Sequence, residues 1–191
     1  MKRVGVLALQ GDVREHASAL AGCGTEVVYV RTPSDLAGLD GIVIPGGEST
    51  TIAYLLGTSG LRSSLTGALT DGLPVLGTCA GLIMLSSTMV GGREDQWSFG
   101  LLDITVQRNG YGRQIASFET PIEVEGVGVV PGVFIRAPRI TQWGDVQVLA
   151  TYDRGDGVHP VLVRHGSAWG CSFHPELTTN LGVHELFTSS F

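Results

Sequence analysis

Apolar residues in the first half of the chain form short runs, and the segments between them have the apolar spacing of helices. The runs span residues 4–9, 27–30, 42–44 and 75–76, and the helical segments span residues 13–21 and, as two short helices, 52–69. Short apolar runs that alternate with helices are typical of a parallel sheet covered by helices. The pattern therefore predicts an α/β fold.

The second half of the chain has the pattern of β-structure with one closing helix. Short apolar segments lie at residues 104–106, 122–124, 133–135, 146–150 and 161–163, and the helix is expected over residues 183–187. Gly155-Asp156-Gly157 is typical of a turn. With no internal repeat or low-complexity linker, and with 191 residues available for one core, we expect a single domain over residues 1–191.

The clearest chemical signal is Gly77-Thr78-Cys79-Ala80-Gly81, which follows the apolar residues 73–76 and precedes a helix-like segment. Small residues on both sides of Cys79 allow a tight strand-to-helix turn that lifts a nucleophile clear of the sheet. The N–H groups at the start of the following helix favour a thiolate at this position. We interpret Cys79 as a nucleophile.

A base and an orienting group for this nucleophile are expected near the end of the chain. His174 and Glu176 lie two positions apart after an apolar segment, so an extended backbone places both on one side. This arrangement suits an imidazole held by a carboxylate. The alternative is that Cys79 is a small buried residue and His174 a surface loop residue, which the two contexts together disfavour.

A second glycine-rich turn follows the apolar residues 42–44. Gly46-Gly47 leaves backbone N–H groups exposed, and the next residues are typical of a helix start. One of these donors and the N–H of Ala80 would together form an oxyanion hole for a tetrahedral intermediate. A phosphate-binding loop is the rival interpretation, but neither G-x-x-x-x-G-K-[ST] nor G-x-G-x-x-G is present here.

Composition and charge argue against several classes of protein. The formal charge is −6, only 16% of residues are charged and no basic stripe is present, so nucleic acid is not an expected partner. No apolar run approaches the roughly 20 residues that cross a bilayer, and the N-terminus lacks the features of a signal peptide. Three widely spaced cysteines do not make a disulfide framework. We expect a cytoplasmic protein.

The remaining cysteines and histidines give no sign of a metal site. Cys23 and Cys171 have apolar or glycine neighbours and are interpreted as core thiols. His159, His165 and His184 lack metal-ligand spacing with one another or with cysteine. We therefore expect no metal ion.

These motifs resemble those of the class I, triad-type glutamine amidotransferases, because the Cys79 motif is followed by His174-Pro175-Glu176. Within that group the chain resembles the PdxT family, the glutaminase subunits of pyridoxal 5′-phosphate synthases. The segments that carry this resemblance are residues 5–16, 45–51, 77–83, 108–114, 132–138 and 170–178. It implies a three-layer, flavodoxin-like α/β fold with an open, mainly parallel sheet and a nucleophile elbow.

The resemblance implies that the chain hydrolyses L-glutamine to L-glutamate and ammonia through a cysteine thioester. Cys79 is the implied nucleophile, His174 the general base and later acid, and Glu176 the residue that orients His174. The implied oxyanion donors are the N–H groups of Gly47 and Ala80. No cofactor is implied, because pyridoxal 5′-phosphate is the product of the complex.

The resemblance also implies a set of glutamine-binding residues. They are Gly47, Glu48, Ser49, Arg108, Ile135 and Arg136. Arg108 and Arg136 supply forked donors for a carboxylate, and Glu48 is suited to an ammonium. The alternative for these side chains is a solvated surface charge.

The implied partner is a PdxS-type (β/α)8 barrel synthase subunit in a hetero-oligomeric complex, which combines ammonia with a pentose phosphate and a triose phosphate. Ammonia released into water is protonated and of no use to such a synthase. We expect the first strand-to-helix turn, residues 10–16, to touch this partner. His16 is interpreted as lying on a solvated helix face or in the partner surface.

Three other functions fit parts of the sequence. A free-standing cysteine hydrolase, such as a γ-glutamyl hydrolase, shares the elbow and works without a partner. A glutaminase for another synthase, such as one of a histidine or nucleotide pathway, keeps the triad but lacks the segments at residues 5–16 and 132–138. A non-catalytic regulator has no need of Cys79, His174 and Glu176 together.

Overall fold

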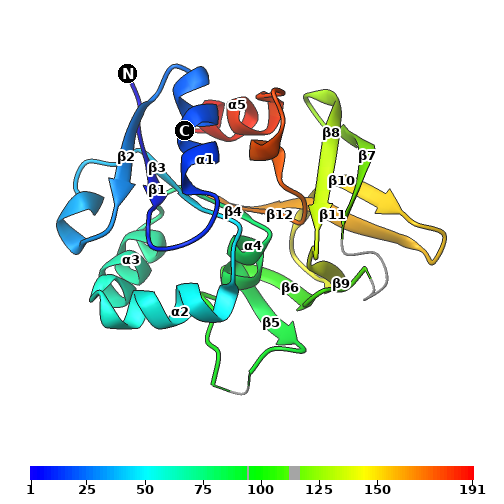
Figure 1. Cartoon of the computed structure of the whole chain (residues 1–191), viewed down its shortest axis with the longest axis horizontal. Helices are drawn as coiled ribbons and strands as arrows, with labels where there is room; N and C mark the ends of the chain where they lie inside the picture. The colour runs from blue at the N-terminus through cyan, green and yellow to red at the C-terminus, as the bar shows by residue number, and fades with distance from the viewer. Residues whose placement is uncertain (94, 112–116) are drawn as a thin grey trace.

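The computed structural model describes residues 1–93, 95–111 and 117–191. Its centre is a sheet of seven strands in the order β10-β11-β12-β4-β3-β1-β2 (Figure 1). In sheet order the strands are β10 Gln147–Asp153, β11 Val158–His165, β12 Ala168–Cys171, β4 Val75–Thr78, β3 Gly41–Ile44, β1 Arg3–Leu7 and β2 Glu26–Val30. The pairs from β12 to β2 are parallel, whereas β11 is antiparallel to both of its neighbours.

Helices cover both faces of this sheet, as the alternating pattern of the first half predicts. On one face lie α1 Val13–Gly22 and α5 Gly182–Ser189, and on the other lie α2 Ser49–Thr58, α3 Leu61–Thr70 and α4 Ala80–Leu85 (Figure 1). Within β3, Ile42 and Ile44 pack in the core of the second face and Val43 in the core of the first. The three-layer, mainly parallel α/β prediction is therefore confirmed.

Two smaller sheets and two short 3₁₀ helices complete the described chain. One sheet contains β5 Ser86–Val90, β6 Leu102–Gln107 and β9 Arg139–Trp143, and the other is a hairpin of β7 Ser117–Val124 and β8 Gly128–Ile135. The 3₁₀ helices are η1 Pro33–Leu36 and η2 Pro175–Leu177. None of the helices in the described ranges is long and apolar enough to cross a membrane.

The strands that the sequence pattern missed are β5, β9 and β12. β5 is Ser-Ser-Thr-Met-Val, whose mixed polar residues give a weak β signal. β12 is only four residues long and contains a glycine, yet it is buried along its whole length in the middle of the main sheet. Burial on both sides, rather than local propensity, determines that this segment is a strand.

The turn after β4 passes unusually close to the neighbouring strand. A Cβ placed at Gly81 would lie 2.1 Å from the carbonyl oxygen of Ile44, and a Cβ at Gly77 would lie 2.5 Å from the backbone of Gly81. Real Cβ atoms do not approach other heavy atoms so closely. Only glycine at these two positions allows α4 to start against β3.

We expect Gly81→Ala to destabilise the protein by about 1–3 kcal/mol or more, because the added methyl group would push α4 away from β3. Gly67→Ala in α3 is the matched control, since a Cβ there meets no atom within 4 Å. The control should stabilise the protein by about 0.4–1 kcal/mol. Urea unfolding measures both changes, and an unchanged stability of Gly81→Ala would contradict the tight packing of the turn.

Candidate active site

Cys79 lies between the end of β4 and the start of α4, on the turn that its neighbours predict. Its φ is 49°, in the left-handed region that few residues other than glycine adopt. Its N–H donates a hydrogen bond of 2.8 Å to the carbonyl of Cys171 at the end of β12. The side chain is only 7% exposed. A strained, nearly buried cysteine at the end of a central strand is typical of a functional site.

His174 and Glu176 lie just beyond β12, which pairs in parallel with β4 so that Cys171 is opposite Thr78. Because the carboxyl ends of parallel strands meet at one edge of the sheet, the His174 turn and Cys79 emerge side by side. His174 is 3% exposed and Glu176 6% exposed. The structure thus brings the predicted triad residues together, and their catalytic roles stay a prediction.

The Nδ1 atom of His174 faces two carboxylates. It lies 2.7 Å from Oε1 of Glu176 and 3.4 Å from Oδ2 of Asp12. Carboxylate oxygens accept hydrogen bonds, so Nδ1 carries a proton. The other ring nitrogen, Nε2, has no hydrogen-bond partner among the described residues. In the neutral ring Nε2 is therefore the atom that can take a proton from Cys79.

Burial and charge act in opposite directions on this pair. Burial lowers the pKa of His174, but Asp12, Cys79 and Glu176 outweigh it and raise the pKa to about 12. Burial raises the pKa of Glu176, but the nearby His16 and His174 outweigh it and hold the pKa well below its ordinary range. Glu176 therefore stays ionised, and His174 readily holds a second proton.

The glycine-rich turn after β3 packs directly on this histidine. A Cβ at Gly46 would lie 2.5 Å from Cε1 of His174, and the carbonyl of Gly46 accepts a 3.1 Å hydrogen bond from the N–H of Asp12. Gly47 has a φ of 151° and lies against the side chain of Gln10. Oε1 of Gln10 accepts a 2.8 Å hydrogen bond from the N–H of Glu48.

The two predicted oxyanion donors lie at the ends of adjacent strands. Gly47 follows β3 and Ala80 begins α4 directly after β4, and these strands pair in parallel. Gly47 is exposed and Ala80 is buried beside Cys79. Their position on the rim next to the nucleophile suits the predicted role, which stays a prediction.

Glu48 and Arg108, two of the predicted glutamine-binding residues, form an ion pair. Nη2 of Arg108 lies 2.6 Å from Oε1 of Glu48, while Oε2 of Glu48 accepts a 2.8 Å hydrogen bond from the N–H of Thr51 and caps α2. Burial raises the pKa of Glu48, but the Thr51 bonds and Arg108 outweigh it and lower the pKa. Ser49, also predicted, is buried, and its hydroxyl has no partner among the described residues.

Ile135 and Arg136, the other two predicted glutamine-binding residues, come from a different part of the chain. Both are exposed at the end of β8, and Arg136 has a φ of 44°. The carbonyl of Val133, two residues before Ile135, accepts a 2.8 Å hydrogen bond from the N–H of His174. The end of β8 is thereby attached to the histidine turn. Residues 112–114, the end of the segment 108–114, lie outside the described residues.

Sequence reasoning missed four residues of the site: Asp12, His16, Thr78 and His184. The interpretation of His16 as a solvated or partner-facing residue is wrong, because its side chain is completely buried. The signal was present, since Val13, His16, Ala17 and Leu20 follow the spacing of one helix face. Arg14 and Glu15 of the same helix are exposed.

The described residues contain one group with the proximity of metal ligands. Asp12, His174 and Glu176 offer atoms that all lie within 4.8 Å of one another. The contacts of His174 Nδ1 with both carboxylates already account for this proximity, so the absence of a metal stays our prediction. Burial raises the pKa of the Cys171 thiol, whose Sγ donates to the carbonyl of Phe173, as expected for a core thiol.

A solved structure described as a glutamine amidotransferase superposes on the chain with a TM-score of 0.90, at 47% identity and over 97% of both chains. At 18% identity, the structure of PurLQS from Thermotoga maritima matches the fold with a TM-score of 0.73 over 99% of this chain and 98% of that chain. With the geometry above, the first of these matches defines a glutamine amidotransferase of the class I type. Residues 6–191 match the family model of the SNO glutamine amidotransferase family, and the chain belongs to this family.

Relatives with a narrower name span almost the same length. The protein named pyridoxal 5′-phosphate synthase subunit PdxT in Mycobacteroides abscessus is 51% identical over 96% of this chain and 94% of the relative. The protein of the same name in Thermotoga maritima is 46% identical over 97% of both chains. The resemblance to the PdxT family is therefore confirmed.

Removing the carboxylate in Glu176→Gln should lower the pKa of His174 markedly, because the closest negative charge on Nδ1 is lost. Asp12→Asn should lower it as well, since Oδ2 of Asp12 lies 3.4 Å from the same nitrogen. NMR titration of the imidazole signals measures both changes. Glu119→Gln on the exposed face of β7 is the control and should leave the titration of His174 unchanged. Equal titrations in all variants would contradict the proposed electrostatics.

Proposed function

We propose that this chain is a glutaminase subunit that hydrolyses L-glutamine to L-glutamate and ammonia at Cys79 and passes the ammonia to a pyridoxal 5′-phosphate synthase. The observation that carries the proposal is the hydrogen bond between His174 and Glu176 beside a strained cysteine. Membership of a glutamine amidotransferase family, with close relatives named PdxT, supports the choice of substrate and complex.

The first half of the reaction forms a thioester. Nε2 of His174 takes the thiol proton of Cys79, and the sulfur attacks the carbon of the glutamine side-chain amide. The N–H groups of Gly47 and Ala80 stabilise the negative oxygen of the tetrahedral intermediate. The C–N bond then breaks as His174 gives its proton to the leaving nitrogen, which departs as ammonia and leaves a glutamyl thioester on Cys79.

The second half of the reaction releases glutamate. His174 takes a proton from water, the resulting hydroxide attacks the thioester carbon, and the C–S bond breaks as the sulfur regains a proton. Each transfer uses Nε2 while Nδ1 stays hydrogen-bonded to Glu176, so Glu176 fixes the ring and stabilises its charged form. This chain needs no cofactor for either half.

Glutamine recognition is assigned to the charged groups on the same rim. Arg108 suits the α-carboxylate and Glu48 the α-ammonium, and their ion pair places both charges within reach of one amino acid. Gly47, Ser49, Ile135 and Arg136 complete the proposed binding set. The exposed end of β8 would close over the bound substrate from the side of the histidine turn.

The proposed partner is a PdxS-type (β/α)8 barrel synthase that docks on the loop between β1 and α1. Residues 8–12 of this loop and 13–15 of α1, with Tyr29 and Arg31, line a hollow of about 440 Å³. Asp12 of the loop contacts His174, so the proposed docking surface continues into the active site. A partner bound here would receive ammonia without its release into water.

The first test of the proposal is glutamate release from glutamine, with and without a pyridoxal phosphate synthase subunit. We expect release to need both the synthase and Cys79, with Cys79→Ala reducing it by roughly 10³-fold or more. Thermal unfolding of the variant controls for its fold. Full activity without a partner would favour the free-standing hydrolase, and no glutamate under either condition would overturn the glutaminase assignment.

Reversing charge in Arg14→Glu/Glu15→Lys should weaken activation by the synthase by about tenfold, since both side chains are exposed beside the proposed docking hollow. The control is Asp71→Lys. Asp71 is exposed and precedes β4, so it lies at the amino-terminal ends of the parallel strands, away from the active site. The measurement is the synthase concentration that gives half-maximal glutamate release. Equal values for both variants and the wild type would contradict this docking surface.

A further inference from the structure

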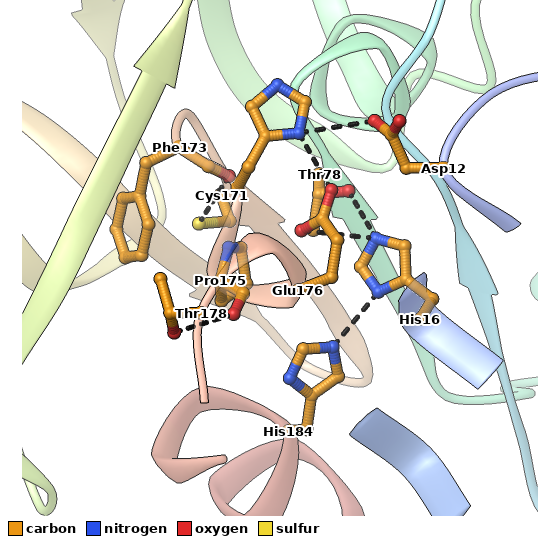
Figure 2. A network of polar contacts seen from close by, with 10 residues as sticks. Asp12, His16, Thr78, Cys171, Phe173, Pro175, Glu176, Thr178 and His184 are labelled. Atoms are coloured by element: carbon orange, nitrogen blue, oxygen red, sulfur yellow. Dashed lines mark hydrogen bonds and ion pairs between the residues drawn. The ribbon is translucent and has the colours of Figure 1, made fainter. Parts of the chain in front are cut away.

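A buried chain of polar side chains continues from the triad into the interior (Figure 2). His16 of α1 is at its centre. Nε2 of His16 lies 2.8 Å from Oγ1 of Thr78 and 3.4 Å from Oε2 of Glu176, and Nδ1 lies 3.0 Å from Nε2 of His184. The mechanism above uses neither His16 nor His184.

The elements packed around His16 present three polar groups to it. These are the Thr78 hydroxyl from β4, the Glu176 carboxylate from η2 and the His184 imidazole from α5. The side chains of His16, Thr78 and His184 are completely buried. Beyond Glu176, the next charged or titratable groups are His174 and Asp12, with Cys79 directly after Thr78. Because these side chains are shielded from bulk solvent, the neighbouring protein groups determine the positions of the protons.

Of the two neutral tautomers of His16, one fits its buried neighbours better. With a proton on Nε2, His16 donates toward Thr78 and the ionised Glu176, while Nδ1 accepts from Nε2–H of His184. The opposite tautomer would turn a lone pair toward a buried carboxylate. It would also place a proton on Nδ1 of His184, which has no partner among the described residues. An unpartnered buried N–H costs more than an unpartnered lone pair, which favours the first arrangement.

We propose that His16 is a positioning residue of the glutaminase site, whose Nε2–H holds the Glu176 carboxylate and the Thr78 hydroxyl at the distances that align His174 with Cys79. The proposal rests on the proposed glutaminase function. His16 touches neither the substrate nor the reacting atoms, and acts through Glu176 and Thr78.

This contact joins the two strands that supply the triad. Thr78 is the last residue of β4 and directly precedes the nucleophile, whereas Glu176 orients the base from beyond β12. One imidazole ring contacts both, through a hydrogen bond to Thr78 and a 3.4 Å contact with Oε2 of Glu176, which has no hydrogen bond of its own among the described residues. A shift of either turn would therefore disturb a buried polar contact.

The position of the proton on His16 can be read directly in the intact protein. Burial lowers the pKa of His184 to about 3, so this residue is neutral and its tautomer is fixed. The chain has 5 histidines, which keeps the ¹⁵N-histidine NMR spectrum simple, and the variants His16→Gln and His184→Gln assign the two signals. We expect a protonated Nε2 and an unprotonated Nδ1 on His16. A protonated Nδ1 with a bare Nε2 would overturn the proposal.

Two substitutions of similar volume separate positioning from packing. His16→Gln places an amide N–H where Nε2–H lies, whereas His16→Leu fills the space without a donor. In the presence of the synthase, we expect His16→Leu to lower kcat for glutamate release by about tenfold or more with KM changed less than about twofold. His16→Gln should restore kcat to within about threefold of the wild type.

The pH profile gives a signature that packing alone would not produce. Without the Nε2–H donor the Glu176 carboxylate is less stabilised and its pKa rises, so the acidic limb of kcat against pH should move to higher pH in His16→Leu but not in His16→Gln. His165→Gln is the matched control on an exposed histidine and should change neither kcat nor the profile.

The outcomes distinguish this proposal from the proposed function. A wild-type protein that releases no glutamate with the synthase would overturn the glutaminase assignment and this role together. An active wild type with His16→Leu equally active, or with Leu and Gln equally impaired and the acidic limb unmoved, would overturn the role of His16 alone. If His16→Leu does not fold, the tautomer of the wild type and the profile of His16→Gln decide the question.

Discussion

The parallel pairing of β12 with β4 is the constraint on which the site depends. It places Cys171 opposite Thr78, and a slip of one residue would turn each side chain of a strand to the other face of the sheet. The nucleophile and the base come from two separate turns that lie far apart in the chain. Their distance is therefore set by backbone hydrogen bonds in the middle of a buried sheet, where the structure is least able to adjust.

The second determinant is the ionised carboxylate of Glu176, which is almost completely buried. A buried charge is costly unless hydrogen-bond donors surround it. His174 forms a hydrogen bond with one of its oxygens, and His16 lies 3.4 Å from the other. The carboxylate that orients the His174 ring is therefore itself held in place by His16. The result is a rigid acid–base unit, although the turns that carry it lie at the rim of the sheet.

Local sequence was sufficient for the parts of this site that local geometry creates. The strained turn at Cys79 requires small neighbours, and the His174 turn requires its spacing to Glu176, so both are visible in short motifs. Asp12 and β12 were not predictable in the same way, because their positions depend on contacts with distant segments. His16 was predictable in principle: it shares a helix face with apolar residues, and a polar residue on such a face is buried with a partner.

Gly46 links these observations in mechanical terms. Its carbonyl accepts from the Asp12 N–H, its Cα lies against the His174 ring, and the Asp12 carboxylate returns to that ring, which closes a small loop of contacts. Parts of such a closed loop cannot be displaced one at a time. A movement of the segment between β1 and α1 would therefore also move the imidazole and the neighbouring Gly47, because they are joined by direct contacts with no intervening residues.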